Sequence, residues 1–143
     1  MKKNFRIILL SAFISIVFYA CNKPLIASYD QYAYTQATSL KVDIQNLIQK
    51  SDSVKYTDAA DEINRVTVEI QKAYEYSKGR SQNSISTKQY EILLSDADFY
   101  KKFLSTWKAQ GTESPTAASE ASIKAGQLID KIIELENGKN KPQ

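Results

Sequence analysis

Apolar side chains recur every three or four residues along most of the chain, and this period is the feature that most constrains the fold. Such spacing places them on one face of a helix, so it predicts an amphipathic helix from about Asp30 to Lys50. Period-two runs of β-branched residues, which indicate strands, are few. The apolar positions of this first helix are Tyr29, Ala33, Ala37, Leu40, Ile44, Leu47 and Ile48.

Two further stripes predict helices of similar length. One begins after Thr57 or Asp58, either of which can cap the free N–H groups of a first turn, and it ends at Gly79. Its apolar positions are Ala59, Ile63, Val66, Ile70, Ala73 and Tyr74. The last helix begins at Ser114-Pro115, because proline at the first helical position gives up an N–H that has no partner. Its stripe runs to Asn137-Gly138 through Ala118, Ala121, Ala125, Leu128, Ile129, Ile132 and Leu135.

The remaining helix has two start signals. Ser86 and Gln89 match the S-x-x-Q capping box, while Ile85 and Tyr90 occupy the positions of a hydrophobic staple. Its apolar residues then continue to the turn at position 111, and include Leu93, Leu94, Ala97, Phe103, Leu104 and Trp107. The segment 95–98 contains serine and aspartate, which favour caps, so it predicts either a kink or a division into two shorter helices.

Four amphipathic helices of about 20 residues bury their apolar faces most simply as an up-down bundle. We therefore predict an all-α fold with one helical domain over residues 30–138 and a loose tail over 139–143. The residues expected in its core include Leu40, Ile44, Ile70, Leu104 and Ile132.

The first 21 residues have the features of an export signal. A basic start is followed by an apolar run from Ile7 to Ala20, about 14 residues against the roughly 20 that span a membrane. This run stops directly before Cys21, the one cysteine of the chain. A small residue before such a cysteine resembles the lipobox of bacterial lipoproteins, which implies cleavage and acylation of the thiol. We predict a signal peptide over 1–20 and a lipidated Cys21 with a short tether over 21–29. The alternative is an ordinary signal or an uncleaved anchor.

Acylation of Cys21 would hold the mature protein at a membrane, because each buried methylene of an acyl chain contributes about 0.8 kcal/mol. Asn22 differs from the aspartate that sorting rules associate with inner-membrane retention. The residues that follow Asn22 also lack the acidic cluster that directs some lipoproteins to the cell exterior. By resemblance to these rules, we expect an outer-membrane protein that faces the periplasm.

Charge and composition exclude several classes of function. The chain has 19 basic and 16 acidic residues, and three of the basic ones lie in the leader, so the rest is balanced. A balanced body lacks the basic face that nucleic-acid binding requires. The chain also contains no histidine, which excludes a His-based triad and a Cys/His zinc site. No cofactor is expected, and only carboxylate-based catalysis remains open.

Two clusters of acidic residues could form a site. Asp58, Asp61 and Glu62 lie on adjacent turns and could share a hard cation through oxygen ligands. The preferred interpretation is that they stabilise a first helical turn through the helix dipole. Asp96 and Asp98 point in different directions on a continuous helix, so they are interpreted as caps rather than as a catalytic pair. No metal site is predicted.

The segment from Tyr74 to Arg80 is the densest mixture of aromatic, basic and turn residues. Arginine and tyrosine at such a turn suit contact with an anionic surface. In an up-down bundle this segment shares one end with the tether, so we predict that the turn from Lys78 to Lys88 rests against the bilayer. The competing interpretation is that the tyrosines fill the bundle end and the charges are solvated. The candidate interface residues are Tyr74, Tyr76, Lys78, Arg80 and Lys88.

Several stretches resemble a group of small, uncharacterised lipoproteins of Gram-negative bacteria. They are Tyr29-Asp30 leading to Leu40-Lys41, Ala73 to Tyr76 with Gly79-Arg80 and Asn83, and Ile132 to Pro142. The resemblance implies a lipoprotein with a helical body and implies no activity.

These observations predict a lipid-anchored, non-enzymatic helical envelope protein that binds a protein or an envelope component. One alternative is a protective or inhibitory lipoprotein directed against a hydrolase, a toxin or a phage. A second alternative is a carboxylate-based hydrolase of cell-wall glycans, which a deep cleft with two facing acids would favour.

Overall fold

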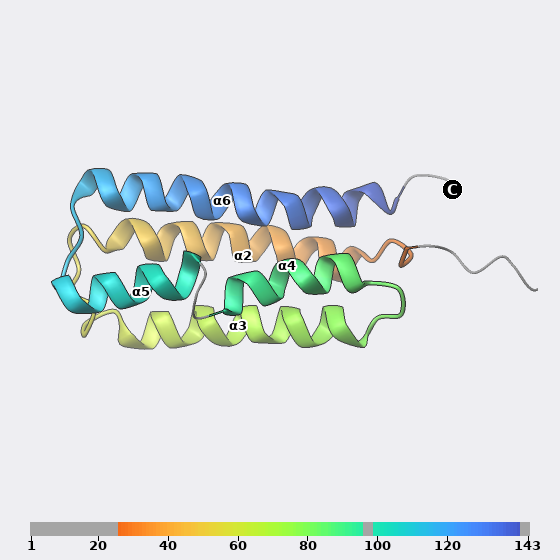
Figure 1. Cartoon of the computed structure of the whole chain (residues 1–143), viewed down its shortest axis with the longest axis horizontal. Coiled ribbons are helices and arrows are strands. Elements are labelled where there is room, and N and C mark those ends of the chain that lie inside the picture. Colours follow the sequence, from red (N-terminus) through yellow and green to blue (C-terminus); the bar gives the residue numbers. More distant parts are fainter. Residues whose placement is uncertain (1–25, 96–98, 141–143) are drawn as a thin grey trace, which may run out of the picture.

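Five helices occupy the part of the chain that the computed structural model describes, residues 26–95 and 99–140 (Figure 1). They are α2 (Gln31–Lys50), α3 (Ala60–Gly79), α4 (Ser84–Leu94), α5 (Phe99–Gln110) and α6 (Pro115–Gly138). No strand occurs within these described residues. The predicted all-α bundle is therefore confirmed, while the predicted signal peptide and Cys21 lie outside the described residues.

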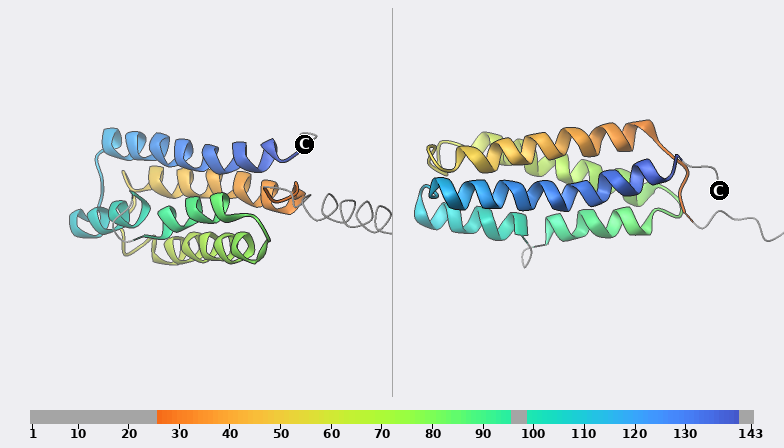
Figure 2. Two further views of the ribbon diagram at one scale, coloured as in Figure 1. Left: turned by 45° about the vertical axis from the view of Figure 1, so that its right-hand side comes forward. Right: turned by 90° about the horizontal axis from the view of Figure 1, so that it is seen from above.

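The helices lie along one long axis, and the chain reverses direction at every connection except the one between α4 and α5, which run the same way. Figure 1 shows α2, α3 and α6 side by side, with α4 and α5 end to end in the fourth position. Figure 2 shows from a second direction that α4 and α5 follow each other along α6. We call the end that holds the start of α2, the α3–α4 turn and the end of α6 the proximal end. The opposite end, with the α2–α3 and α5–α6 loops, is the distal end.

Two of the predicted helix boundaries are confirmed in detail. Asp30 caps α2, because its carboxylate accepts hydrogen bonds from the backbone N–H groups of Tyr32 (2.8 Å) and Ala33 (3.1 Å). Ser114 caps α6 by accepting from the N–H of Ala117 at 3.1 Å, with proline at the first helical position.

The predicted capping box is wrong. α4 begins at Ser84, and Ile85 is 53% exposed, so it does not form the expected staple. The hydroxyl of Ser86 instead donates to the carboxylate of Glu136 at 2.7 Å. The start of α3 also differs, because its N-cap position is Ala59, which has no side chain able to cap.

The predicted division of the third helix is resolved in favour of two helices, since α4 ends at Leu94 and α5 begins at Phe99. Asp96 and Asp98 lie outside the described residues. Gly111 follows α5 with a φ of +86°, a conformation that glycine adopts without strain.

The predicted stripes form the core. Of the five core residues chosen from the sequence, Leu40, Ile44, Ile70 and Ile132 are buried. The prediction is wrong for Leu104, which is only partly buried and lines a surface groove. α2 and α6 approach closely, and a side chain at Gly126 would lie 2.6 Å from Nε2 of Gln45.

Within residues 26–95 and 99–140, every helix is too short or too polar to cross a membrane.

Candidate functional site

Charged side chains from three parts of the chain meet at the proximal end. Arg80, which follows α3, donates from Nη1 to Oε2 of Glu136 at 3.0 Å and from Nη2 to the carbonyl of Ser28. Its Nε lies 3.6 Å from Oδ2 of Asp30, and the side chain is 14% exposed. Arg80 is thus held inside the bundle end by two carboxylates.

Glu136 lies at the centre of this arrangement, with a side chain only 2% exposed. Its Oε1 accepts hydrogen bonds from Ser86 Oγ (2.7 Å) and from Lys139 Nζ (2.5 Å). Lys139 also donates to Asn83 and to Ser86. The prediction of a loose tail is therefore wrong for Lys139, whose side chain is 6% exposed because Glu136 attracts it back onto the bundle.

Side-chain hydrogen bonds extend the arrangement to the other helices. The Asn83 amide donates to the carbonyl (3.1 Å) and the hydroxyl (2.7 Å) of Ser77 on α3. The Tyr76 hydroxyl donates to Asp30 Oδ2 at 2.6 Å. These contacts connect α2, α3, α4 and α6. We call the group the proximal network, and it comprises Asp30, Tyr76, Ser77, Arg80, Asn83, Ser86, Glu136 and Lys139.

The proximal network shifts the titration of its two acids. The hydrogen bond from Tyr76 is the main cause that lowers the pKa of Asp30 below its usual value. For Glu136, burial acts to raise the pKa, but the hydrogen bonds from Lys139, Ser86 and Arg80 together outweigh it, so the pKa is lowered. Both carboxyls are consequently charged at neutral pH, and their charges balance those of Arg80 and Lys139.

The sequence-predicted interface residues divide between the proximal network and the surface of the α3–α4 turn. Tyr76 and Arg80 belong to the proximal network, where Arg80 is not available to bind an external anion. Tyr74 is half-buried under Lys78, whose Nζ lies 5.4 Å from the ring centroid. Lys78 and Lys88 are exposed, and together with Arg80 they line a depression of about 420 Å³ at the α3–α4 turn.

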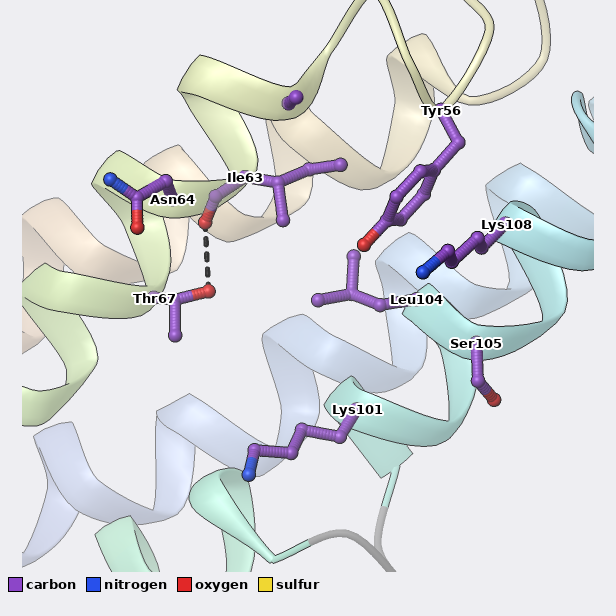
Figure 3. A pocket seen from close by; sticks show the side chains of 9 residues that line it. Tyr56, Ile63, Asn64, Thr67, Lys101, Leu104, Ser105 and Lys108 are labelled. Carbon is purple, nitrogen blue, oxygen red and sulfur yellow. Dashed lines mark hydrogen bonds between the residues drawn. The ribbon is translucent and has the colours of Figure 1, made fainter.

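A different surface, which sequence analysis did not identify, flanks α5 in the distal half. A depression of about 470 Å³ separates α5 from α3, and no Cα atom of one helix lies within 8 Å of the other. Figure 3 shows Tyr56, Ile63 and Leu104 converging on this space. Lys101 and Lys108 also line it. We call it the α3–α5 groove.

A second depression lies on the opposite side of α5, against α6, with a volume of about 540 Å³. We call it the α5–α6 groove. Its apolar lining consists of Ile92, Phe99, Phe103 and Leu128, and its charged residues are Lys102 and Lys124. One short helix therefore separates two apolar grooves, each bordered by lysines.

Three lysines on or beside α5 have no carboxylate partner among the described residues. Across residues 26–95 and 99–140, Lys102, Lys108 and Lys124 have no carboxylate within salt-bridge distance. Lys108 and Lys124 lie over aromatic rings, 5.9 Å from the centroid of Tyr56 and 5.2 Å from that of Phe99. Six other lysines have a carboxylate within 4 Å, namely Lys41, Lys50, Lys72, Lys78, Lys88 and Lys139, whereas Lys55 and Lys131 are not among them.

The acidic residues around the start of α3, Asp58, Asp61 and Glu62, do not form a metal site. Glu62 forms a salt bridge with Lys50 at 2.7 Å, and Asp61 lies in the first turn of α3. Within residues 26–95 and 99–140, no group of three His, Cys, Asp or Glu side chains could hold a metal ion.

Comparisons with protein-family models, with curated proteins and with solved structures found no match.

Proposed function

We propose that this chain is a lipid-anchored, non-enzymatic helical protein of the bacterial outer membrane, which faces the periplasm and binds a protein or an envelope component. The observation that carries the proposal is the contrast between the ends of the bundle. Charged side chains close the proximal end upon themselves. Open apolar grooves lie in the distal half, and three of their lysines, Lys102, Lys108 and Lys124, have no carboxylate partner among the described residues.

The position of Cys21 in the sequence supports an orientation in which the proximal end lies near the membrane. Ile26, where the described chain starts, comes five residues after Cys21, and five extended residues reach at most roughly 18 Å. An acylated Cys21 would therefore keep the proximal end near the bilayer. The 20 residues of α2 extend about 30 Å away from that end, which would direct the grooves of α5 into the periplasm.

The side chains at the proximal end suit a membrane surface. Tyr32 and Tyr76 are exposed and pack edge to face, with ring centroids 4.7 Å apart. Tyrosine favours the interface between membrane and water, and each lysine near an anionic surface contributes about 1 kcal/mol. We therefore propose that the turn from Lys78 to Lys88 faces the bilayer.

Acylation is tested by mass spectrometry of the mature N-terminus. We expect the mature chain to begin at an acylated Cys21, and a Cys21→Ser variant to accumulate as a precursor or to leave the membrane fraction. An unmodified Cys21 in the mature protein contradicts the anchor.

The orientation is tested with spin labels on Ser81→Cys and Thr112→Cys variants of the lipidated protein in liposomes. Ser81 lies in the α3–α4 turn and Thr112 in the distal α5–α6 loop, and both are exposed in the bundle. We expect an aqueous quencher to reach Thr112 but not Ser81. Equal access to both positions means that the turn does not contact the membrane.

Binding is tested by photo-crosslinking in intact cells. A photo-reactive amino acid in place of Ser105 would report on the α3–α5 groove, and the same group in place of the exposed Ser39 on α2 serves as the control. We expect a discrete adduct from Ser105 and none from Ser39. The absence of an adduct from either position, and from other exposed positions of the bundle, would contradict a binding role.

A further inference from the structure

We infer that α5 and its two grooves are a docking surface for an acidic segment of a partner protein, which inserts apolar side chains on both sides of the helix and places carboxylates over the lysines. This inference rests on the proposed function and specifies the chemistry of the partner.

The first argument is the shape of the surface. α5 has 12 residues and a length of about 18 Å, and the grooves follow its two sides. It contributes Leu104 to the α3–α5 groove and Phe99 and Phe103 to the α5–α6 groove. A partner that straddles α5 can therefore anchor apolar side chains at two places, as helix-in-groove recognition does.

The second argument is charge complementarity. In both grooves every charged lining residue is a lysine: Lys101 and Lys108 on one side, Lys102 and Lys124 on the other. The partner would supply carboxylates for Lys102, Lys108 and Lys124, which have none among the described residues. Apolar floors beside these lysines would exclude water on binding and strengthen each ion pair.

The shape and the charge of this surface disfavour two other occupants, a second copy of the chain and an acyl chain. A second copy that pairs α5 with α5 about a two-fold axis would place lysines against lysines. An acyl chain requires a more enclosed apolar site than these open grooves provide. The grooves also lie in the half of the bundle that would be directed away from the bilayer. Both occupants remain outcomes of the tests below.

Trp107, the one tryptophan of the chain, is a built-in reporter for this surface. Its buried ring lies between the grooves, with centroids 5.6 Å from Tyr56 and 6.2 Å from Phe103. We propose titrating the purified lipidated protein in detergent with a synthetic amphipathic helical peptide of leucine and glutamate, free of aromatic residues. Its counterpart, with lysine in place of glutamate, is the second probe.

We expect a saturable change in Trp107 emission with the glutamate peptide and none with the lysine peptide. Lys108→Glu and Lys124→Glu should each weaken binding by roughly three- to tenfold, because an attraction becomes a repulsion. Lys72→Glu is the matched control, since it makes the same charge change on α3 outside both grooves and should leave affinity unchanged. Equal binding of both peptides, or equal effects of all three substitutions, would overturn the inference.

Crosslinking from Ser105 and from Thr106, which line opposite grooves, then identifies the natural occupant. An adduct with an acidic protein segment supports the inference. An adduct with a neutral or basic segment, a lipid or a second copy overturns it. An adduct only at Ser39 would place the binding site on α2, which contradicts the inference about α5 but leaves the proposed binding function intact. The absence of an adduct at every exposed position would contradict both the inference and the proposed binding function.

Discussion

The two ends of the bundle are closed by different chemistry. At the proximal end, Arg80 and Lys139 meet Glu136 in a buried cluster of charges. At the distal end, the loops are joined by backbone hydrogen bonds, from the Glu113 N–H to the Ser51 carbonyl (2.7 Å) and from the Tyr56 N–H to the Gly111 carbonyl (3.0 Å). The proximal closure therefore depends mainly on particular side chains, besides one backbone hydrogen bond from the Ala27 N–H to the Gln82 carbonyl (3.0 Å), whereas the distal closure depends mainly on the path of the backbone.

This difference determines which residues are constrained by the fold and which surface is available for binding. A buried charge is tolerated only while its partners remain, so the proximal network constrains residues on four helices together. The distal half is stabilised by apolar packing around Trp107, whose Nε1 donates to the Val54 carbonyl at 3.1 Å. The exposed faces of α5 take no part in either closure, which leaves them available for binding.

The largest effect is expected when the proximal network loses its central acid. Glu136→Ala leaves Arg80 and Lys139 without their shared carboxylate, and removing one partner of a buried ion pair typically costs about 3–5 kcal/mol. Denaturant unfolding of the chain without residues 1–21 measures the loss. Glu134→Ala is the control, because Glu134 is exposed on the same helix and its loss should change stability by less than about 0.5 kcal/mol. Equal effects of the two substitutions would mean that the network adds little.

The second expected effect separates the core from the groove. Ile44→Ala should cost about 2–5 kcal/mol, because Ile44 is fully buried and its loss leaves a cavity. Leu104→Ala should cost only about 1 kcal/mol, since Leu104 is only partly buried and lines the open α3–α5 groove. Denaturant midpoints of the two variants make the comparison, and a cost for Leu104→Ala as large as that for Ile44→Ala would show that the groove closes in solution.

The helices and most of the core could be predicted from the sequence because they depend on period and local caps. The role of Glu136 was missed, although the signal was present: it lies four residues after Ile132, on the buried stripe of α6. A glutamate at a buried stripe position requires partners, and Lys139 three residues later was one of them. Ser86 was misassigned for the related reason that its hydroxyl has two uses, as a helix cap or as a donor to a distant carboxylate.

The grooves beside α5 could not be predicted from local sequence patterns. The sequence of α5 contains lysines and aromatics without an acid, but this composition also fits an ordinary amphipathic helix. The grooves arise because α5 follows α4 along α6 without approaching the backbone of α3. That placement is a property of the whole bundle, and no local pattern encodes it.

The stability of the proximal end should depend on pH through Asp30 and Glu136. The folded pKa values of Asp30 and Glu136 lie below the unfolded values, which are about 3.8 and 4.5. Their contribution to stability is therefore complete above the unfolded pKa values and is lost as pH falls through the folded ones. We expect the free energy of unfolding to decrease below about pH 4.5, and Glu136→Gln to make this decrease shallower. A Glu134→Gln control should keep the original slope, and an unchanged slope in Glu136→Gln would contradict the assignment.

The smallest expected effect concerns the buried acid of the distal end. Glu113 is 8% exposed, and its Oε1 has no hydrogen-bond partner among the described residues. An amide costs less to bury than a carboxylate with an unpartnered oxygen, so Glu113→Gln should change stability by less than about 1 kcal/mol, in the stabilising direction. The same substitution at Glu136 should be destabilising, because Arg80 and Lys139 there require a full charge. Thermal unfolding of both variants at neutral pH makes the comparison. A loss above about 2 kcal/mol for Glu113→Gln would show that the distal carboxylate has a charged partner in solution and that both ends are closed by ionic contacts.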